Sequence, residues 1–572
     1  MSNKIWEILP VLTEKIKKEN QDINKIILQI LFNRGLCQKD EIDYFLNSEY
    51  KKNISDPFLF SHMQSAVELI IEHIKNKNKI YIYGDYDADG VTSAAVLYET
   101  LSILKARMEI YIPDRVTEGY GLNLKAIDEI SGSGAKLIIT VDGGIRNKEE
   151  VAYAQALGLD IIITDHHVPP RKENLPQCLI INPLAESENY PFKKLAGVGV
   201  AFQLARALIL RSTLNDEIKE KLEENILDLA AIGTVADCVS LLGENRLLVK
   251  KGLEILNKKK RTGILELIKA AELNLDKEMD VWNIGFQIGP RLNAAGRMDH
   301  ANTAFELLVT KDTAEAGVLA KNLNEKNTDR QRFTEDILKE VEKQIKENDK
   351  IIIGICPAGD DIWQEGVIGL VAGRLSEKYY KPALVITRTD EGYKGSGRSI
   401  AEFNIIEAIT ECAELLDKFG GHPSACGFSF FEKNLAIFIE RMKKIAEEKL
   451  NNIDLRPKII IDCEIELDEI SEELALEIKR LAPFGEDNDR PKFISKNLQI
   501  MDIIKIGLSG QHLKLKLKTD NSNFFSALGF WQAEKWDGLR IGDTIDIVYN
   551  IDLNEFNGRR EAQMKIIDIK IS

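Results

Sequence analysis

Asp85, Asp87 and Asp89 stand at alternate positions, and no basic residue lies between them. They follow a β-branched and aromatic run at 79–82, which predicts a buried strand, and they precede an apolar run of helical spacing at 91–104. Open α/β sheets bind ligands at such junctions. Three neighbouring carboxylates repel one another, and a divalent cation that prefers oxygen ligands, Mg²⁺ or Mn²⁺, relieves the repulsion. The alternative is a solvated acidic turn with an aspartate helix cap.

Further carboxylates and imidazoles follow later elements. The apolar runs at 137–141 and 160–164 predict two more strands, and the run at 227–235 predicts a helix. The side chains at the ends of these three elements are Asp142, Asp165, His166, His167 and Asp237. A lone histidine on an apolar face is usually a satisfied core residue. Two adjacent histidines after a strand and an aspartate favour a ligand role instead.

Imidazole beside carboxylates shifts the preferred metal from magnesium toward manganese, with zinc as an open alternative. Several aspartates that can bridge suggest two ions about 3.5–4 Å apart. Such a pair clamps the attacking and leaving oxygens of an in-line phosphoryl displacement.

The composition indicates a soluble protein of three or four domains, with 572 residues, 44% hydrophobic and 29% charged. No segment approaches the ~18 apolar residues of a membrane span, and the N-terminus lacks the apolar core of a secretory signal. Seven scattered cysteines without a CxxC pair indicate reduced thiols in a cytoplasmic protein. The net charge of −15 argues against a protein that coats nucleic acid, and alone it favours a small-molecule enzyme.

Pattern changes along the chain predict an α/β protein with five parts. Alternating strands and helices in the second part predict a mainly parallel sheet with right-handed crossovers. A charged helical stretch predicts a linker helix, and five short alternating runs near the C-terminus predict an OB-like β-barrel. The basic run 258–261 is typical of a solvated helix end. The expected parts are a helical region (1–75), a catalytic domain (76–305), the linker helix (306–348), a second α/β domain (349–452) and the barrel domain (453–572).

The ordered aspartate and histidine motifs described above resemble those of the DHH phosphoesterase superfamily. Later motifs narrow the resemblance to the RecJ family of single-stranded-DNA exonucleases. These are the Gly/Ala/Arg-rich segment 288–300, the Ser/Arg segment 395–399 and the Gly-Gly-His segment 419–427, of which the last two resemble a DHHA1 domain. The resemblance covers roughly residues 40 to 572. One departure is Gln364, where this family usually has histidine.

The resemblance implies two-metal phosphodiester hydrolysis with Mn²⁺ or Mg²⁺, and two ions are expected. We expect Asp142 to bridge the ions, His167 to touch phosphate and Asp165 to orient the imidazoles. Asp85 is either a further ligand or a residue that orients ligands. The expected metal ligands are Asp87, Asp89, Asp142, His166 and Asp237.

The resemblance also implies phosphate contacts by Arg291 and Asn293, more weakly by Arg297, because small neighbours let the backbone approach and these side chains fork onto phosphate oxygens. The alternative for that segment is a tight helix entry. In the DHHA1-like part, Ser396, Arg398 and His422 are expected to hold the nucleic-acid backbone. The alternative for Arg398 and His422 is a turn-stabilising side chain. Arg115 faces the cleft or makes a loop salt bridge.

We therefore predict a single-stranded-DNA-specific 5′-to-3′ exonuclease that releases mononucleotides in DNA repair and recombination. The polarity is inferred from the family, as are a helicase and a single-strand-binding protein as partners. Two alternatives remain. One is another DHH phosphohydrolase, acting on short oligonucleotides, cyclic dinucleotides or pyrophosphate. The other is a non-catalytic relative that binds single strands.

Overall fold

The computed structural model describes residues 4–115, 117–186, 188–359, 362–518, 524–556 and 559–571. The chain forms two compact units. One contains 1–55, 238–251 and 456–572, and the other contains 56–237 and 252–455. Among the described residues, no helix has both the length and the apolar character needed to cross a membrane.

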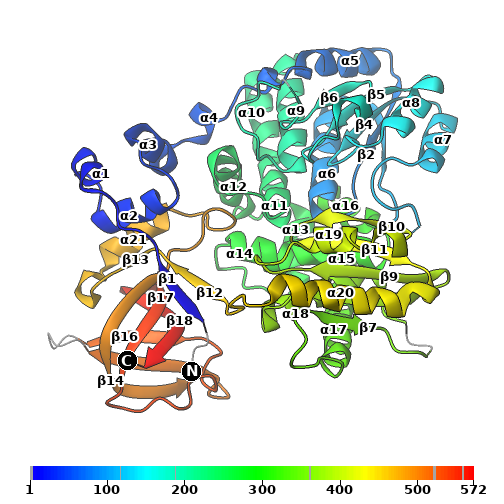
Figure 1. Ribbon diagram of the computed structural model, residues 1–572. Helices are drawn as coiled ribbons and strands as arrows, with labels where there is room; N and C mark the ends of the chain where they lie inside the picture. The colour runs from blue at the N-terminus through cyan, green and yellow to red at the C-terminus, as the bar shows by residue number, and fades with distance from the viewer. Residues whose placement is uncertain are drawn as a thin grey trace. The chain divides into compact units, whose positions relative to one another are not determined.

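The first sheet of the second unit is fully parallel, in the order β3-β2-β4-β5-β6, with β4 between β2 and β5 (Figure 1). This confirms the predicted parallel α/β sheet. Every residue of β2 is buried, as expected for a parallel strand covered on both faces. The strands are β2 (Lys79–Tyr83), β3 (Arg107–Tyr111), β4 (Ala135–Val141), β5 (Asp160–Thr164) and β6 (Leu179–Ile181).

Helices of this unit pack around that sheet. α6 packs against α9 and α11 and is buried over most of its length, because apolar residues surround it on all sides. These helices are α5 (Met63–Lys75), α6 (Ala88–Ile103), α7 (Leu124–Gly132), α8 (Lys148–Ala156), α9 (Gly197–Arg211), α10 (Asp216–Asn225) and α11 (Leu227–Ala236).

A long helix, α17 (Thr313–Glu342), confirms the predicted linker helix. It packs against α13, α15 and α18. The helices before it are α13 (Thr262–Ala270), α14 (Val281–Asn283), the π-helix η3 (Ile284–Ile288), α15 (Gly289–Met298) and α16 (Asn302–Val309).

The second sheet of this unit has the order β10-β11-β9-β8-β7, and only β7 and β8 are parallel. Its strands are β7 (Ile352–Ile355), β8 (Ala383–Thr389), β9 (Gly392–Arg398), β10 (Lys418–His422) and β11 (Ala425–Phe430), and its helices are α18 (Glu365–Tyr379), α19 (Ile405–Thr410) and α20 (Leu435–Leu450). The Ser/Arg segment 395–399 lies largely in β9, and the Gly-Gly-His segment 419–427 lies in the β10–β11 hairpin. Glycine suits β9 because a Cβ on Gly395 would lie 2.2 Å from the Phe428 ring.

The other unit contains the predicted OB-like barrel. Its strands close in the order β14-β15-β16-β18-β17, and β17 pairs back with β14. The strands are β14 (Phe493–Ile506), β15 (His512–Lys518), β16 (Phe524–Gly529), β17 (Thr544–Phe556) and β18 (Arg559–Ile571), with the short β13 (Cys463–Glu464) beside β14.

The N-terminal helices belong to the same unit as this barrel. Ile30 and Phe45 share one core with Ile478 and with barrel residues such as Leu515 and Tyr549. The opening that we predicted as helical contains helices and also one strand, because β1 (Ile5–Ile8) pairs in parallel with β12 (Lys458–Ile461), a partner too distant to be predicted from local pattern. The helices are α1 (Glu14–Glu19), α2 (Lys25–Asn33), α3 (Lys39–Asn47), α4 (Tyr50–Asn53), α21 (Glu472–Arg480) and the first part of α12 (Gly243–Leu256). The predicted domain boundaries stay a prediction.

Candidate metal centre and phosphate-binding residues

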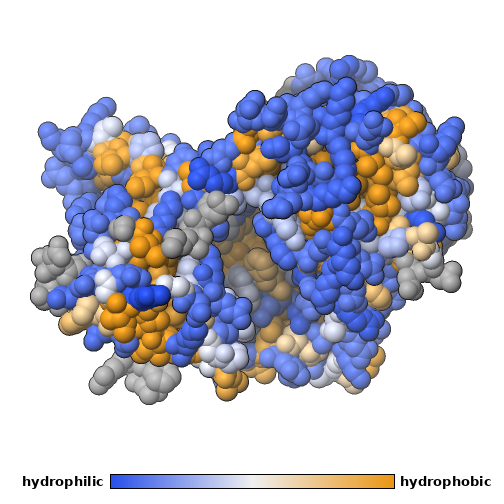
Figure 2. All heavy atoms as spheres, turned by 60° about the horizontal axis from the view of Figure 1, so that its bottom comes forward, coloured by the Kyte–Doolittle hydropathy of each residue, from blue (hydrophilic) through white to orange (hydrophobic). Residues whose placement is uncertain are grey.

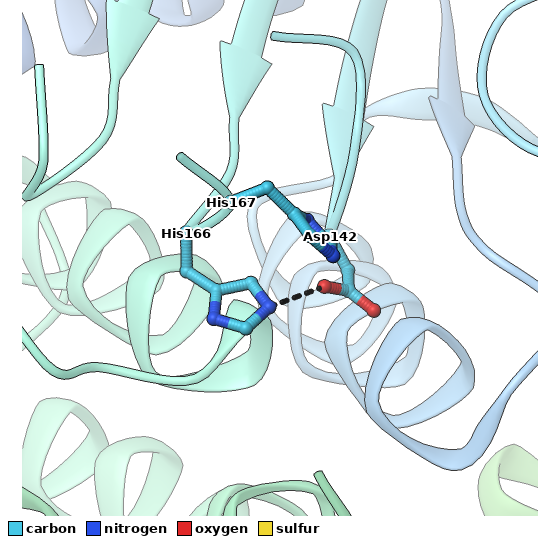
Figure 3. A group of neighbouring side chains, drawn as sticks. All are labelled: Asp142, His166 and His167. Carbon is cyan, nitrogen blue, oxygen red and sulfur yellow. Dashed lines mark ion pairs between the residues drawn. The ribbon is translucent and has the colours of Figure 1, made fainter. Parts of the chain in front are cut away.

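The carboxyl ends of three adjacent strands place the acidic and imidazole side chains. Val141 pairs with Thr164, so Asp142 and Asp165 follow paired residues on neighbouring strands. Figure 3 shows Asp142 at the end of its strand, with the ring of His166 turned toward the Asp142 carboxylate. Asp142 has φ of 57°, a left-handed conformation that is uncommon outside glycine and that clusters at functional sites.

The alternating aspartates follow β2 and open α6. Asp87 is the N-cap, and its Oδ1 accepts hydrogen bonds from the backbone N–H of Asp89 (2.9 Å) and of Gly90 (3.1 Å). One oxygen of Asp87 therefore caps the helix, as the alternative interpretation of this motif predicted. Since the cap uses Oδ1, it does not conflict with a ligand role for the second carboxylate oxygen.

Asp89 is held by the start of α9. Its two oxygens accept hydrogen bonds from the backbone N–H of Gly197 (2.7 Å) and of Val198 (2.8 Å). Position 197 requires glycine, because a Cβ there would lie 2.4 Å from Oδ1 of Asp142. The Gly-Val-Gly segment 197–199 is thus a close-packed helix start that stabilises a carboxylate at a helix N-terminus.

The end of α11 brings in the last carboxylate, that of Asp237. The Nε2 atom of His166 lies 3.2 Å from Oδ1 of Asp142 and 3.6 Å from Oδ2 of Asp237. Three groups of donors have their atoms within 4.8 Å of one another: Asp85 with Asp87 and Asp142; Asp89 with His166 and Asp237; and Asp142 with His166 and His167. The structure therefore gathers all five expected ligands, and it adds Asp85 and His167.

Several donor atoms of this cluster are buried and have no hydrogen-bond partner among the described residues. They are Oδ1 of Asp85, Oδ1 of Asp142, Oδ2 of Asp237 and Nε2 of His166. Buried polar atoms are rarely left unpaired, because each costs its desolvation free energy. Carboxylate oxygens with an imidazole nitrogen are suitable ligands for Mn²⁺ or Mg²⁺. The residues present therefore fit a divalent metal centre.

The pKa values of the clustered carboxylates also favour a divalent metal centre. Burial, and secondarily the charge of Asp87, raises the pKa of Asp85 to about 8 and that of Asp89 to about 7. Burial and the charge of Asp89 raise the pKa of Asp237 to about 9. The pKa of Asp142 is also raised well above its usual range by burial and by the surrounding carboxylates. Such crowding of like charges is stable as anions only with a cation among them.

His166 and His167 differ in protonation. Burial, and then the neighbouring His167, lowers the pKa of His166 to about 4, so its ring is neutral and can donate a lone pair to a metal. Burial alone would lower the pKa of His167, but its hydrogen bond to Asp165 (Nδ1 to Oδ1, 2.8 Å) raises it above the usual value. Asp165 also accepts N–H bonds from the His166 and His167 backbone and from Ile145, so it fixes the whole turn.

Tyr120 is a site residue to which the sequence analysis gave no role. Its hydroxyl lies 3.0 Å from Nδ1 of His167 and 3.4 Å from the carbonyl oxygen of Asp142. The Glu-Gly-Tyr-Gly run at 118–121 was the available signal, since its glycines permit a tight turn. Asn182 also donates to the carbonyl oxygen of His167 at 2.9 Å.

Arg291 and Arg297 lie on α15, and neither is paired with a carboxylate in the described part of the chain. Nη1 of Arg291 donates to the carbonyl oxygen of Gln287 (2.8 Å), and Nη1 of Arg297 donates to that of Gly366 (2.9 Å). Burial, and then the repulsion of Arg115 and Arg330, lowers the pKa of Arg297 to about 10. Clustered guanidinium groups of this kind suit an anionic ligand.

Asn293 is at least partly a positioning residue, because its Oδ1 accepts the N–H of Ala88 at 2.7 Å and so ties α15 to the aspartate motif. On β9, the Arg398 side chain bonds the carbonyl oxygen of Gly397 (2.9 Å) and lies 3.5 Å from Oγ of Ser396. Burial lowers the pKa of Arg398 most, and the positive charge of Arg115 lowers it further. The Arg115 guanidinium lies over the ring of Tyr86, which stands between Asp85 and Asp87 in the sequence. His422 is exposed in the β10–β11 hairpin.

Comparisons with known proteins agree with this fold and site. The N-terminal domain of the DHH family matches residues 79–234, the DHHA1 domain matches 348–448, and the RecJ OB domain matches 461–568. The fold is therefore that of a DHH-family protein. The single-stranded-DNA-specific exonuclease RecJ of Bacillus subtilis is 38% identical, with 99% of this chain and 71% of that protein covered. Its Escherichia coli counterpart is 33% identical over 89% of this chain and 90% of that protein.

Solved structures extend the match. RecJ of Thermus thermophilus in complex with Mn²⁺ superposes with a TM-score of 0.82 at 27% identity, with 99% of this chain and 79% of that chain covered. An exonuclease RecJ bound to manganese matches with a TM-score of 0.60 at 33% identity, with 69% of this chain and 98% of that chain covered. The chain belongs to the RecJ family of single-stranded-DNA-specific exonucleases.

Proposed function

We propose that this protein is a metal-dependent exonuclease that degrades single-stranded DNA from its 5′ end and releases mononucleotides. The observation that supports this most is the cluster of buried, unpaired carboxylate and imidazole atoms at the strand ends of a RecJ-family chain. Relatives whose names specify single-stranded DNA cover nearly the whole chain, barrel included.

We assign the metal ligands to Asp87, Asp89, Asp142, His166 and Asp237, and we add Asp85. The cofactor is Mn²⁺ or Mg²⁺, with two ions, and when bound it supplies an activated water and neutralises developing charge on the phosphate. Asp142 takes part in two of the three donor groups, which suits a bridging role. Asp165 fixes the turn and holds the ring of His167.

The chain's own cations would orient the substrate. His167, whose pKa is raised by Asp165, offers a positive charge to a phosphate oxygen near neutral pH. Arg291, Arg297 and Arg398, with Ser396 and His422, would hold phosphates on either side of the cleaved bond. Asn293 would keep α15 against the aspartate motif through Ala88. Buried guanidinium groups cost little reorganisation when the strand binds, since they are already positioned.

The protein acts, in this proposal, in the cytoplasm during DNA repair and recombination, with a helicase and a single-strand-binding protein that supply and cover the strand. The family resemblance supports these partners. No disulfide joins the cysteines in the described part of the chain, which suits a reducing compartment.

The test uses a single-stranded oligonucleotide labelled at one end or the other, with Mn²⁺, and an Asp142→Asn control. Mononucleotides released only from the 5′ end, and absent with the control, are expected. Release from the 3′ end would contradict the polarity but keep the metal centre. Turnover of dinucleotides, cyclic dinucleotides or pyrophosphate without cleavage of long strands would identify a different DHH phosphohydrolase.

A further inference from the structure

Two exposed aromatic rings form a pair on the surface of the second unit. Hydrophilic residues cover much of the face drawn in Figure 2, with separate apolar areas among them. Trp282 is 55% exposed and Phe286 68% exposed, and their rings stack with centroids 5.7 Å apart and planes 25° apart. Scattered exposed apolar side chains are normal, but two large stacked rings lose a substantial transfer free energy when left in water.

The helix beneath these rings leads directly into the catalytic region. α14, η3 and α15 form one continuous helical stretch from Val281 to Met298, with a π-helical turn at Ile284–Ile288. Ile284 and Ile288 are buried on the opposite side of this stretch from the rings. A Cβ added to Gly289 would lie 3.4 Å from that of Ala236, so the stretch packs on the end of α11 next to Asp237. Single π turns within helices are frequently found at functional sites.

The order of side chains along this stretch matches the needs of a single strand. The rings come first, and then Arg291, whose Nη1 contacts the carbonyl oxygen of Gln287, the residue after Phe286. Asn293 follows and holds the N–H of Ala88 in the aspartate motif. The two rings and Arg291 therefore lie in sequence along one continuous helical stretch, and Asn293 of the same stretch contacts the aspartate motif.

We propose that Trp282 and Phe286 form a stacking platform for nucleobases of the single-stranded substrate, beyond the phosphate that Arg291 contacts. The proposal rests on the proposed function. Nucleobases are the occupant because the rings share one helical stretch with Arg291, a proposed phosphate contact, and with Asn293, which contacts the aspartate motif. Stacking on aromatic rings tolerates any base, which a sequence-independent nuclease requires.

The first experiment compares the wild type with Trp282→Ala, Phe286→Ala and Trp282→Phe. Affinity for an uncleavable phosphorothioate strand is measured together with KM and kcat for a long oligonucleotide and for a dinucleotide. Each alanine variant should raise Kd and KM for the long strand about tenfold, while dinucleotide turnover stays unchanged. Trp282→Phe should restore most of the affinity, since phenylalanine still stacks. Tyr153→Ala, which removes an exposed aromatic ring from α8, is the matched control and should change nothing.

The second experiment uses strands in which abasic sites replace successive nucleotides. An abasic site opposite the platform should weaken wild-type binding and abolish the difference between the wild type and Trp282→Ala. Equal affinity of wild type and Trp282→Ala for ordinary strands would overturn the platform. A lowered melting temperature with unchanged DNA affinity would also overturn it and assign the rings to packing within the protein. Binding is measured without cleavage, so the two proposals are tested separately. A wild type that binds single strands but cleaves none would contradict the proposed function, and the binding data for the Trp282 and Phe286 variants would still decide the stacking platform.

Discussion

Two groups of buried charges in the second unit behave in opposite ways. In one, Arg261 is fully paired: its guanidinium bonds Asp228 at 2.8 and 2.9 Å, Glu99 at 2.5 Å and the carbonyl oxygens of Leu308 and Asn225. In the other, the carboxylates around Asp142 face one another, and several of their oxygens have no partner.

The difference separates a structural ion-pair network from a ligand site. Burial alone would lower the pKa of Arg261, but Asp228 and Glu99 outweigh it and raise that pKa, so each charge of the network stabilises its neighbours. The pKa values of Asp142 and Asp237 are instead raised, because burial and the charges of neighbouring carboxylates disfavour their ionised forms. A fold keeps such a cluster when a bound cation compensates for it.

Asp142→Asn should have the largest effect and tests whether the carboxylate cluster is a ligand site rather than an ion-pair network like that of Arg261. Asparagine keeps the shape and tolerates the φ of 57°, but it removes a ligand charge. Activity on single-stranded DNA should fall by about a thousandfold or more. The free energy of unfolding of the metal-free protein at pH 8 should rise by about 1 kcal/mol or more, because a repulsive charge is lost. Denaturant unfolding measures the second effect, and a large loss of stability would contradict the account.

Asp228→Asn should give the reverse result. The free energy of unfolding should fall by about 3 kcal/mol, because the buried Arg261 loses a partner. Activity per folded molecule should stay within about twofold of the wild type. Denaturant unfolding with an activity assay at low temperature checks both. Unchanged stability would show that Glu99 alone suffices for Arg261.

The two groups also predict a pH dependence. The folded pKa values of Asp85 and Asp237, about 8 and about 9, lie above that of an unfolded carboxyl, about 3.9. Between these values the folded state binds more protons than the unfolded state, so the stability of the metal-free protein falls as pH rises from about 4 to about 9. Melting temperatures in a chelating buffer should show this fall. Mn²⁺ should reverse it, and Asp142→Asn should reduce it.

Arg297→Gln tests whether this arginine contacts phosphate, and its expected effect is the smallest of these predictions. Affinity for single-stranded DNA should weaken about tenfold, and the slope of log affinity against log salt should decrease by about one. Arg297→Lys should keep the slope, because the charge remains. Arg107→Gln, at the opposite end of the sheet from the metal centre, is the control. An equal effect of both glutamine variants would remove Arg297 from the phosphate contacts.

Local pattern predicted much of the fold and the centre. Apolar runs that end on Asp142 and Asp165 indicate parallel strands, and parallel register then brings the two residues together, as Val141 and Thr164 confirm. Long-range packing escaped the prediction. The backbone N–H groups of Gly197 and Val198 donate hydrogen bonds to Asp89, more than 100 positions away in the sequence. No local sequence pattern predicts these hydrogen bonds. Arg261 likewise belonged to a run that was interpreted as solvated, although its partners bury it.

The most direct test of the central claim is calorimetric titration of the chelator-treated protein with Mn²⁺ at pH 7, repeated in buffers of different ionisation enthalpy. The account predicts two ions per chain with release of protons, because Asp85 and Asp237 must lose theirs to bind metal. Asp142→Asn should lose binding, and Asp228→Asn should keep it. Absence of Mn²⁺ binding by the wild type, or equal binding by Asp142→Asn, would contradict the assignment of this cluster as the metal centre.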